Sequence, residues 1–254
     1  MKIQQIRNAT LRITYAGKLF ITDPMLSPKH AIESFADVSR NPVVDLPFTP
    51  EKVLEGIEMV IVSHVHKDHF DQAAEDLIPK DILMFCQPCD QEILTKKGFQ
   101  SVEAIDRSVV WRKVTITRTS GKHGMGAICK EMGDVSGFIF KADDEPTVYW
   151  TGDTIWCDEV QETMENVKPD IIITHSAGAK LPGSDAIIMD AEQTLAVCRA
   201  ASPEAIVVAT HMEALDHVTV SRAGLRAVAE KERIPSSRLF IPADGEMLDI
   251  DKKF

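Results

Sequence analysis

One apolar segment and the polar loop that follows it constrain the fold more than any other feature of the chain. Residues 59–63 (Met-Val-Ile-Val-Ser) form a continuous apolar run that is typical of a strand buried on both faces. The polar loop from His64 to Asp71 follows at once, and residues 72–77 then have a helix-like pattern. The order of strand, loop and helix predicts an α/β fold with polar side chains at the end of a buried strand.

The rest of the chain continues this alternation. Two or three short strands are expected within 3–22, and further strands at 82–85, 109–118, 136–142, 146–151, 171–174, 205–210 and 239–241. Helices are expected near 90–97, 157–166, 190–201 and 219–231. Residues 24–50 have no regular period and contain five prolines, which indicates either a functional loop or lid, or a plain surface connection.

A faint internal repeat suggests how these elements are grouped. The hairpin that ends in Phe20-Ile21-Thr22-Asp23 resembles the one that ends in Tyr149-Trp150-Thr151-Gly152-Asp153. Each places an Asp just beyond a returning strand, which predicts two related halves, each with its own sheet, packed face to face. No Gly/Ser-rich or Pro-rich linker divides the chain, so residues 1–254 are expected to form one domain.

Composition limits the classes of partner. The net charge of −11 argues against nucleic acid or an anionic membrane as the main partner. No apolar run is long enough to span a membrane, and the N-terminus lacks a signal-peptide pattern, so a cytoplasmic location is expected. The five cysteines fit free thiols in a reducing compartment. Cys86 and Cys89 form a C-x-x-C pair, which is a weak redox signal beside the alternative of two buried thiols.

The loop after the apolar run is dense in metal-ligating residue types. It reads His64-Val65-His66-Lys67-Asp68-His69. In an extended segment, residues i and i+2 point to the same side, so His64 and His66 can bind one metal together. Asp68 and His69 lie where the chain turns toward a helix and can face the same space from another direction. Imidazole and carboxylate ligands suit Zn²⁺, and also Mn²⁺ or Fe²⁺.

Three later segments each place one polar group after a strand-like run. These groups are His123, Asp153 and His211. Side chains at the ends of strands commonly form the sites of α/β sheets. Together with the loop at 64–69 they make seven candidate ligands, which is enough for two metals that share one carboxylate.

The order of these residues resembles a known family. The H-x-H-x-D-H run, the later His123, the T-G-D segment ending at Asp153, and His211 are similar to the metallo-β-lactamase fold superfamily along nearly the whole chain. The segment Ile21-Thr22-Asp23-Pro24 resembles the opening hairpin of that superfamily. The nearer similarity is to the L-ascorbate-6-phosphate lactonase-like metal-dependent hydrolases. The resemblance implies a four-layer αββα sandwich, with two mixed sheets flanked by helices and the metals at one edge.

The resemblance also implies a role for each ligand. His64, His66 and His123 would hold the first metal, Asp68, His69 and His211 the second, and Asp153 would bridge them. Asp68 would in addition orient the nucleophile or carry its proton. Asp23 would orient a ligating His; the alternative is a turn residue before Pro24.

The expected chemistry is hydrolysis by a metal-bound hydroxide. Two divalent ions about 3.5–4 Å apart lower the pKa of a shared water molecule. Asp68, Asp153 and hydroxide do not neutralise two divalent ions, so a small anionic ester or lactone, such as a sugar-phosphate lactone, is the expected substrate. A phosphodiesterase with the same centre is the first alternative, and a non-catalytic metal-binding or sensor protein is the second. The sequence leaves open whether the chain forms a homo-oligomer.

Two further histidines follow apolar segments. His175 could contact substrate or donate a proton to the leaving group, or it could be a hydrogen-bonded loop residue. His217 lies just before the helix expected at 219–231, where it could act in catalysis, support a ligand or cap the helix. Both are therefore candidate catalytic residues with a structural alternative.

Overall fold

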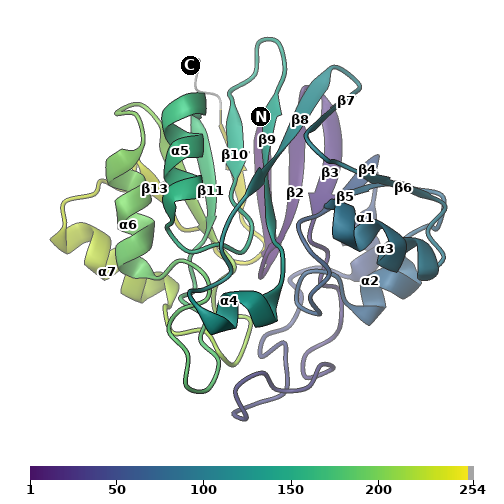
Figure 1. Cartoon of the computed structure of the whole chain (residues 1–254), viewed down its shortest axis with the longest axis horizontal. Helices are drawn as coiled ribbons and strands as arrows, with labels where there is room; N and C mark the ends of the chain where they lie inside the picture. The colour runs from purple at the N-terminus through teal and green to yellow at the C-terminus, as the bar shows by residue number, and fades with distance from the viewer. Residues whose placement is uncertain (251–254) are drawn as a thin grey trace.

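Two seven-stranded β-sheets lie face to face at the centre of the protein (Figure 1), in a computed structural model that describes residues 1–250. The first sheet contains, in spatial order, β14 (Met247–Asp249), β1 (Lys2–Arg7), β2 (Thr10–Tyr15), β3 (Lys18–Thr22), β4 (Met59–Val62), β5 (Leu83–Cys86) and β6 (Ser101–Ala104). The second contains β13 (Leu239–Phe240), β12 (Ile206–Thr210), β11 (Ile171–His175), β10 (Val148–Trp150), β9 (Ser136–Lys141), β8 (Val114–Ser120) and β7 (Ser108–Trp111).

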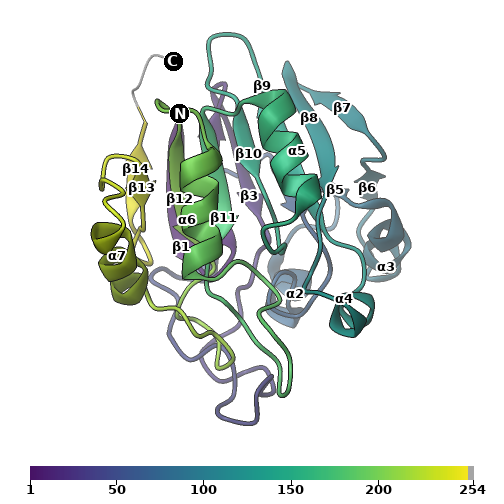
Figure 2. The ribbon, with the colours of Figure 1, turned by 60° about the vertical axis from the view of Figure 1, so that its left-hand side comes forward.

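Helices cover the outer face of each sheet and complete four layers (Figures 1 and 2). The first sheet is covered by α1 (Pro50–Leu54), α2 (Gln72–Leu77) and α3 (Gln91–Lys96), with a short 3-10 helix, η1 (Pro88–Asp90), before α3. The second is covered by α5 (Asp158–Val167), α6 (Ala191–Ala200) and α7 (Arg222–Lys231). The short α4 (Ala127–Met132) lies among the loops at one end (Figure 1). This arrangement confirms the predicted αββα sandwich.

The apolar run in β4 is explained by these layers. Ile61 packs in the core between the two sheets, whereas Val60 and Val62 pack under the helices of the first sheet. A strand that is buried on both faces needs apolar residues at every position. The core between the sheets is rich in aromatic side chains, and the rings of Phe20 and Phe140 stack across it with centroids 5.2 Å apart.

The two sheets share one pattern of antiparallel and parallel pairing, which supports the predicted internal repeat. In the first sheet β14, β1, β2 and β3 pair antiparallel, and β3, β4, β5 and β6 pair parallel. In the second, β7 to β10 pair antiparallel and β10 to β13 pair parallel. Asp23 follows β3 and Asp153 follows β10, so each lies just past the strand where antiparallel pairing changes to parallel.

Several elements differ from the prediction. The single strand expected over 109–118 is a hairpin, because Arg112 and Lys113 adopt positive φ values of 46° and 73° and turn the chain between β7 and β8. Neither is a residue type that normally marks a turn, so the sequence carries no signal there. The sequence also did not predict the short elements β6, β14, α1 and α4.

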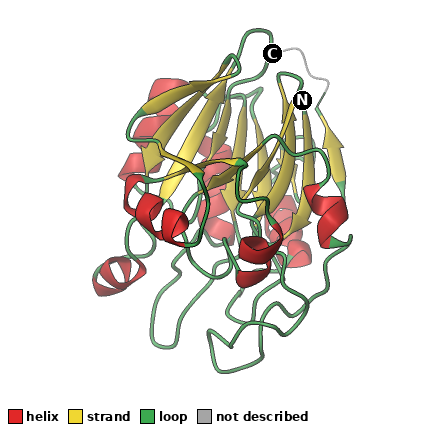
Figure 3. Cartoon of the chain, turned by 90° about the vertical axis from the view of Figure 1, so that its right-hand side faces the viewer, coloured by secondary structure: helices red, strands yellow, loops and turns green. Residues whose placement is uncertain are grey.

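The long segment at 24–50 is largely irregular and lies at the lower end of the sandwich in Figure 1. Most loops gather at this end, opposite the two termini (Figure 3). The buried guanidinium of Arg7 donates hydrogen bonds to the carbonyls of Met25 (3.0 Å), Ser27 (2.8 Å) and Val44 (3.2 Å). A fixed cation therefore holds both ends of this loop against β1. Within residues 1–250, no helix has the length and apolar character needed to cross a membrane.

Candidate metal centre

The carboxyl ends of the central strands bring the predicted ligands to one place. His64 follows β4, His123 follows β8, Asp153 follows β10 and His211 follows β12, and all four are buried. The loop between β4 and α2 adds His66, Asp68 and His69. This loop ends at Asp71, whose carboxylate caps α2 by accepting a hydrogen bond from the Ala74 amide at 2.8 Å.

Three imidazoles form a first donor set. His64, His66 and His123 each offer a ring nitrogen within 4.8 Å of the others. The nitrogens His64 Nε2 and His66 Nδ1 are 2.8 Å apart. His123 uses Nδ1 to donate to the carbonyl of Ile187 at 2.8 Å, so its Nε2 is left as the donor atom for a metal. This is the set that the resemblance implies for the first metal.

A second donor set lies beside the first. His69 Nε2 is 3.2 Å from His211 Nε2 and 3.5 Å from Asp68 Oδ2, and the latter oxygen is 3.3 Å from His211 Nε2. A tetrahedral cage with metal–ligand distances of about 2.0–2.1 Å has edges of roughly 3.3 Å. The spacing of these donor atoms therefore fits a divalent ion.

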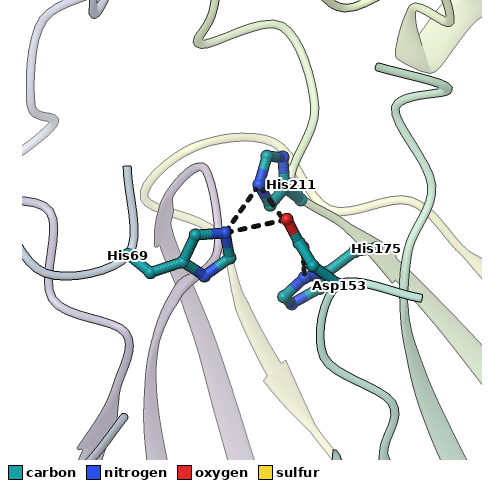
Figure 4. A group of neighbouring side chains, drawn as sticks. All are labelled: His69, Asp153, His175 and His211. Atoms are coloured by element: carbon teal, nitrogen blue, oxygen red, sulfur yellow. Dashed lines mark hydrogen bonds and ion pairs between the residues drawn. The ribbon is translucent and has the colours of Figure 1, made fainter. Parts of the chain in front are cut away.

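Asp153 lies between the two sets. Its Oδ2 is 3.0 Å from His69 Nε2 in the second set and 3.5 Å from His123 Nε2 in the first. Its Oδ1 is 2.5 Å from His175 Nδ1 and 3.6 Å from His211 Nε2 (Figure 4). One carboxylate is thus within reach of both sets, which is the arrangement expected of a shared ligand.

The electrostatics of the cluster also favour a cation. Burial and the neighbouring imidazoles His69 and His66 lower the pKa of His64 well below its ordinary value, so its ring is neutral, as a ligand must be. Burial opposes ionisation of Asp153, but His69 and His211 outweigh it and hold the pKa of that carboxyl well below its usual range. Buried carboxylates surrounded by imidazole nitrogens need a positive charge for stability, and a divalent ion would supply it.

Asp23 orients two of the imidazoles. Its Oδ2 accepts hydrogen bonds from His69 Nδ1 and from Ser63 Oγ, both at 2.7 Å, and Ser63 Oγ lies 3.0 Å from His64 Nδ1. With Nδ1 engaged in this way, both His69 and His64 present Nε2 to the centre. These contacts support the orienting role that the resemblance implies for Asp23, beside its place in the turn before Pro24.

Asn8 is a residue that the sequence analysis missed. It lies in the turn between β1 and β2, donates from Nδ2 to the carbonyl of Asp68 at 2.8 Å, and accepts from the amide of His211 at 2.9 Å. Asn8 therefore ties two candidate ligands to the same turn. Asn8 has a φ of 56°, a conformation that Asn tolerates better than most residues. An Asn between two short strands is therefore the signal that the sequence offered for this turn.

The two additional histidines differ in their placement. His175 is fully buried, lies behind Asp153 and does not line the cavity at the centre, so contact with substrate is not the role its position supports. His217 lines that cavity with 8% of its surface exposed, and its ring packs edge-on against Phe35 with centroids 5.1 Å apart. Burial lowers the pKa of His217, so its imidazole is neutral at pH 7.

A cavity of about 400 Å³ opens onto the candidate metal-ligating side chains. His66, Asp68, His123 and Asp153 line it on the side of the centre. The other walls are formed by Phe35, Val65, Lys67, Met132, Ala179, Leu181, Ile187 and His217. Phe35 belongs to the 24–50 loop, so this loop forms one wall of the site.

Cys86 and Cys89 belong to neither donor set and do not line the cavity. Both are free thiols, Cys86 buried and Cys89 exposed. Burial raises the pKa of Cys86 to about 12, and burial together with Asp90 raises that of Cys89. Raised pKa values leave little thiolate at neutral pH, which disfavours a redox role.

Known proteins resemble the chain over nearly its whole length. The sequence model of a family described as "Beta-lactamase superfamily domain" matches residues 19–212. The UPF0173 protein YddR of Bacillus subtilis (strain 168) is 38% identical over 252 residues, which cover 97% of this chain and 98% of that protein. A UPF0173 metal-dependent hydrolase of Koribacter versatilis (strain Ellin345) is 25% identical over 82% of each chain.

Solved structures agree with the sequence relatives. A possible metal-dependent hydrolase from Veillonella parvula DSM 2008 superposes with a TM-score of 0.94 at 34% identity, covering 98% of this chain and 99% of that one. An isothiocyanate hydrolase from Delia radicum gut bacteria superposes with a TM-score of 0.93 at 36% identity, with the same coverage. The nearer likeness to ascorbate-6-phosphate lactonases stays a prediction. The chain belongs to the beta-lactamase superfamily domain family, and it is a metal-dependent hydrolase.

Proposed function

We propose that the protein is a dinuclear hydrolase that acts on a small molecule with an apolar body and an electrophilic carbon, such as an isothiocyanate. The observation that carries this proposal is the apolar wall of the cavity above the two donor sets. Zn²⁺ is the proposed metal, because imidazole nitrogens and carboxylate oxygens are ligands that it commonly binds. Mn²⁺ and Fe²⁺ bind the same ligand types and are the alternatives.

The cavity wall favours an uncharged substrate. Six of its side chains are apolar: Phe35, Val65, Met132, Ala179, Leu181 and Ile187. Lys67 is the one Lys or Arg among its lining residues. A cavity of about 400 Å³ with such walls is typical of small-molecule sites that bury most of the ligand. The similarity to a protein named as an isothiocyanate hydrolase, at 36% identity, supports the same class of substrate.

The bound ions would lower the pKa of a water molecule and polarise the electrophile. Hydrolysis of an isothiocyanate adds water to the central carbon and breaks the carbon–nitrogen bond, giving an amine and carbonyl sulfide. Asp68 lines the cavity and directs Oδ2 toward His69 and His211. In the described part of the chain nothing hydrogen-bonds its Oδ1, which leaves that oxygen to orient the attacking water.

His217 is the residue we assign to the substrate's polar group. Its Nδ1 is enclosed by protein and out of reach of a ligand, so Nε2 is the ring nitrogen that a substrate can meet, and within residues 1–250 no residue hydrogen-bonds either nitrogen. A buried imidazole without a partner loses free energy unless a ligand supplies one. A hydrogen bond between His217 and a heteroatom of the substrate would supply it and would fix the electrophilic carbon over the donor sets.

A second candidate keeps the expected anionic substrate, a phosphorylated lactone or a phosphodiester. Lys67 is the observation that favours it, because an ammonium group on the cavity wall can pair with a phosphate. One flexible cation among apolar side chains is a weak anion site, and we therefore rank this candidate second.

Turnover by the Zn²⁺-loaded enzyme separates the candidates. Benzyl isothiocyanate, a phosphorylated sugar lactone and bis-(p-nitrophenyl) phosphate are compared at equal concentration, and metal content is measured by mass spectrometry. We expect the highest kcat/KM for the isothiocyanate and two ions per chain. Turnover of the lactone alone would overturn the substrate class, and full activity with one ion per chain would overturn the dinuclear centre.

A substitution in the apolar wall of the cavity tests whether this wall binds the substrate. Leu181→Glu places a carboxylate on the apolar wall and is expected to raise KM for the isothiocyanate about tenfold or more, which corresponds to the loss of one apolar contact surface. Val110→Glu makes the same change at a side chain that is 69% exposed and is the matched control. Equal KM values in both variants would contradict the role of the wall.

A further inference from the structure

Three buried side chains form a hydrogen-bonded chain behind the centre. The indole Nε1 of Trp150 donates to Nε2 of His175 at 3.0 Å, and Nδ1 of His175 is 2.5 Å from Oδ1 of Asp153. Trp150 and His175 are fully buried, and Asp153 is 3% exposed. Water therefore does not compete for these bonds.

The Trp150 bond decides where the proton of His175 lies. An indole N–H is a donor only, so Nε2 of His175 must be the acceptor and carries no proton. The neutral ring then has its proton on Nδ1, which donates it to Asp153. A nitrogen that carries a proton cannot bind a metal. His175 is thus excluded as a ligand, although its Nδ1 lies within 4.8 Å of the donor atoms of His69, Asp153 and His211.

The bond to His175 also distinguishes the two oxygens of Asp153. Oδ1 accepts the proton of His175, while Oδ2 faces His69 Nε2 at 3.0 Å and His123 Nε2 at 3.5 Å. The oxygen that is not engaged by His175 is therefore the one within reach of both donor sets; Figure 4 shows Asp153 between His175 and His69.

The other half of the repeat also holds a carboxylate by hydrogen bonds from the end of a neighbouring strand. Asp23 follows β3, and it accepts hydrogen bonds from the amide and hydroxyl of Ser63, both at 2.7 Å. Ser63 follows β4, the parallel neighbour of β3, just as His175 ends β11, the parallel neighbour of β10. In both halves the first carboxylate past the central strand is held by a donor at the end of the next parallel strand. The Asp153–His175 bond is therefore part of how this fold positions a carboxylate.

We infer that His175 is a positioning residue: Trp150 fixes its tautomer, and its Nδ1–H holds Oδ1 of Asp153 so that Oδ2 alone bridges the two metal positions. The bridging of two metal positions by Asp153 rests on the proposed dinuclear centre. The position of the proton on His175 does not depend on the number of ions. This positioning role replaces the expectation that His175 contacts substrate.

The tautomer is tested directly by NMR. The Zn²⁺-loaded full chain is labelled with ¹⁵N-histidine, and the long-range ¹H–¹⁵N correlations of His175 are assigned by their loss in a His175→Asn variant. We expect a protonated Nδ1 and an unprotonated Nε2. A protonated Nε2 would overturn the inference, because it would free Nδ1 to bind metal. This measurement needs no activity and no variant that folds poorly.

Two substitutions test the consequence for the metals. His175→Leu removes the donor and keeps much of the volume, and it should weaken binding of the second ion about 10- to 100-fold, as loss of such partners typically does. It should also change the visible absorption of the Co²⁺-substituted protein. His175→Asn keeps an N–H close to the place of Nδ1 and should restore both properties to within a few-fold of the wild type.

The control is His217→Leu, which removes another buried imidazole. Within residues 1–250 this ring hydrogen-bonds none of the candidate ligands, so metal affinity should stay unchanged. Wild-type affinity and spectrum in His175→Leu, or equal losses in His175→Leu and His175→Asn, would overturn the inference. A wild-type protein that binds one ion would instead refute the dinuclear proposal, and the NMR result would still decide the role of His175.

Discussion

Asp216 anchors the loop that carries Phe35 over the cavity, so replacing Asp216 with Ala should release that loop. The carboxylate accepts a hydrogen bond from Asn41 Nδ2 at 2.8 Å and another from the hydroxyl of Ser34. It also accepts from the backbone amides of Phe35 (3.1 Å), Ser39 (3.2 Å), Ala36 (3.3 Å) and Val38 (3.4 Å). The Asp216 carboxylate thus accepts hydrogen bonds from many of the polar groups of the irregular segment at 34–41.

The size of the effect follows from these bonds. A hydrogen bond to a charged acceptor contributes about 1.5–3 kcal/mol, but the freed amides regain water when the loop opens. We therefore expect the free energy of loop opening to fall by about 2–3 kcal/mol, the net value of one or two such bonds. At about 1.4 kcal/mol for each factor of ten, opening becomes roughly 30- to 150-fold more frequent.

Hydrogen exchange followed by mass spectrometry measures this opening. In Asp216→Ala we expect faster exchange in peptides covering 30–41, unchanged exchange in β4 and β11, and a higher KM with a smaller change in kcat, because Phe35 no longer closes the cavity. Asp37→Asn removes a carboxylate from the same loop at an exposed position, where it has no hydrogen-bond partner within residues 1–250, and it is the matched control. Unchanged exchange at 30–41 in Asp216→Ala, or equal acceleration in the control, would refute the reasoning.

The anchor also has a predictable pH dependence. Burial tends to raise the pKa of Asp216, but hydrogen bonds from Ser34, Asn41 and the backbone amides outweigh it and hold that pKa well below its usual range. A lowered pKa in the folded state contributes stability above the unfolded value of about 3.9, and this contribution is lost as pH falls below it. After division by the intrinsic exchange rate at each pH, the protection of the amides at 30–41 should therefore fall below about pH 4 in the wild type and stay constant between pH 5 and 8.

Three further substitutions have defined outcomes. Asp23→Asn replaces the carboxylate that orients His69 and should weaken metal binding about 10- to 100-fold in competition with a chelator; unchanged affinity would contradict its role. Arg7→Met leaves three loop carbonyls without their cation and should lower the free energy of unfolding in urea by about 3 kcal/mol, whereas a loss under 1 kcal/mol would show that water replaces the guanidinium. Asn8→Ala removes the bond to the Asp68 carbonyl and should cost about 1 kcal/mol of stability together with metal affinity; stability loss alone would limit Asn8 to a structural role.

The sequence predicted the architecture well where burial leaves a periodic pattern. The apolar runs in β4, β11 and β12 and the echo between Asp23 and Asp153 were sufficient to predict two sheets and their related halves. The hairpin at 108–120 was missed because Arg112 and Lys113 turn the chain without a typical turn residue. Short edge strands such as β6 and β14 were missed because too few residues are buried to leave a pattern.

The candidate site divides in the same way. Imidazoles and carboxylates at the ends of strands are visible as residue types, so the seven candidate ligands could be proposed from the chain alone, and the structure brings them together. The roles of the residues that orient these ligands could not be predicted in the same way. Asn8 and Asp68 are 60 residues apart, and no local pattern connects a turn amide to a distant carbonyl.

The sequence by itself determined which strands are buried and which side chains can bind a metal, because both depend on the chemistry of single residues and on short-range periodicity. The tertiary structure alone decided that His175 hydrogen-bonds Asp153 and that an apolar wall faces the candidate metal centre. Those properties arise from distances and hydrogen-bond directions between segments far apart in the chain, such as Trp150 Nε1 to His175 Nε2 at 3.0 Å, and they exist only after the sheets have packed.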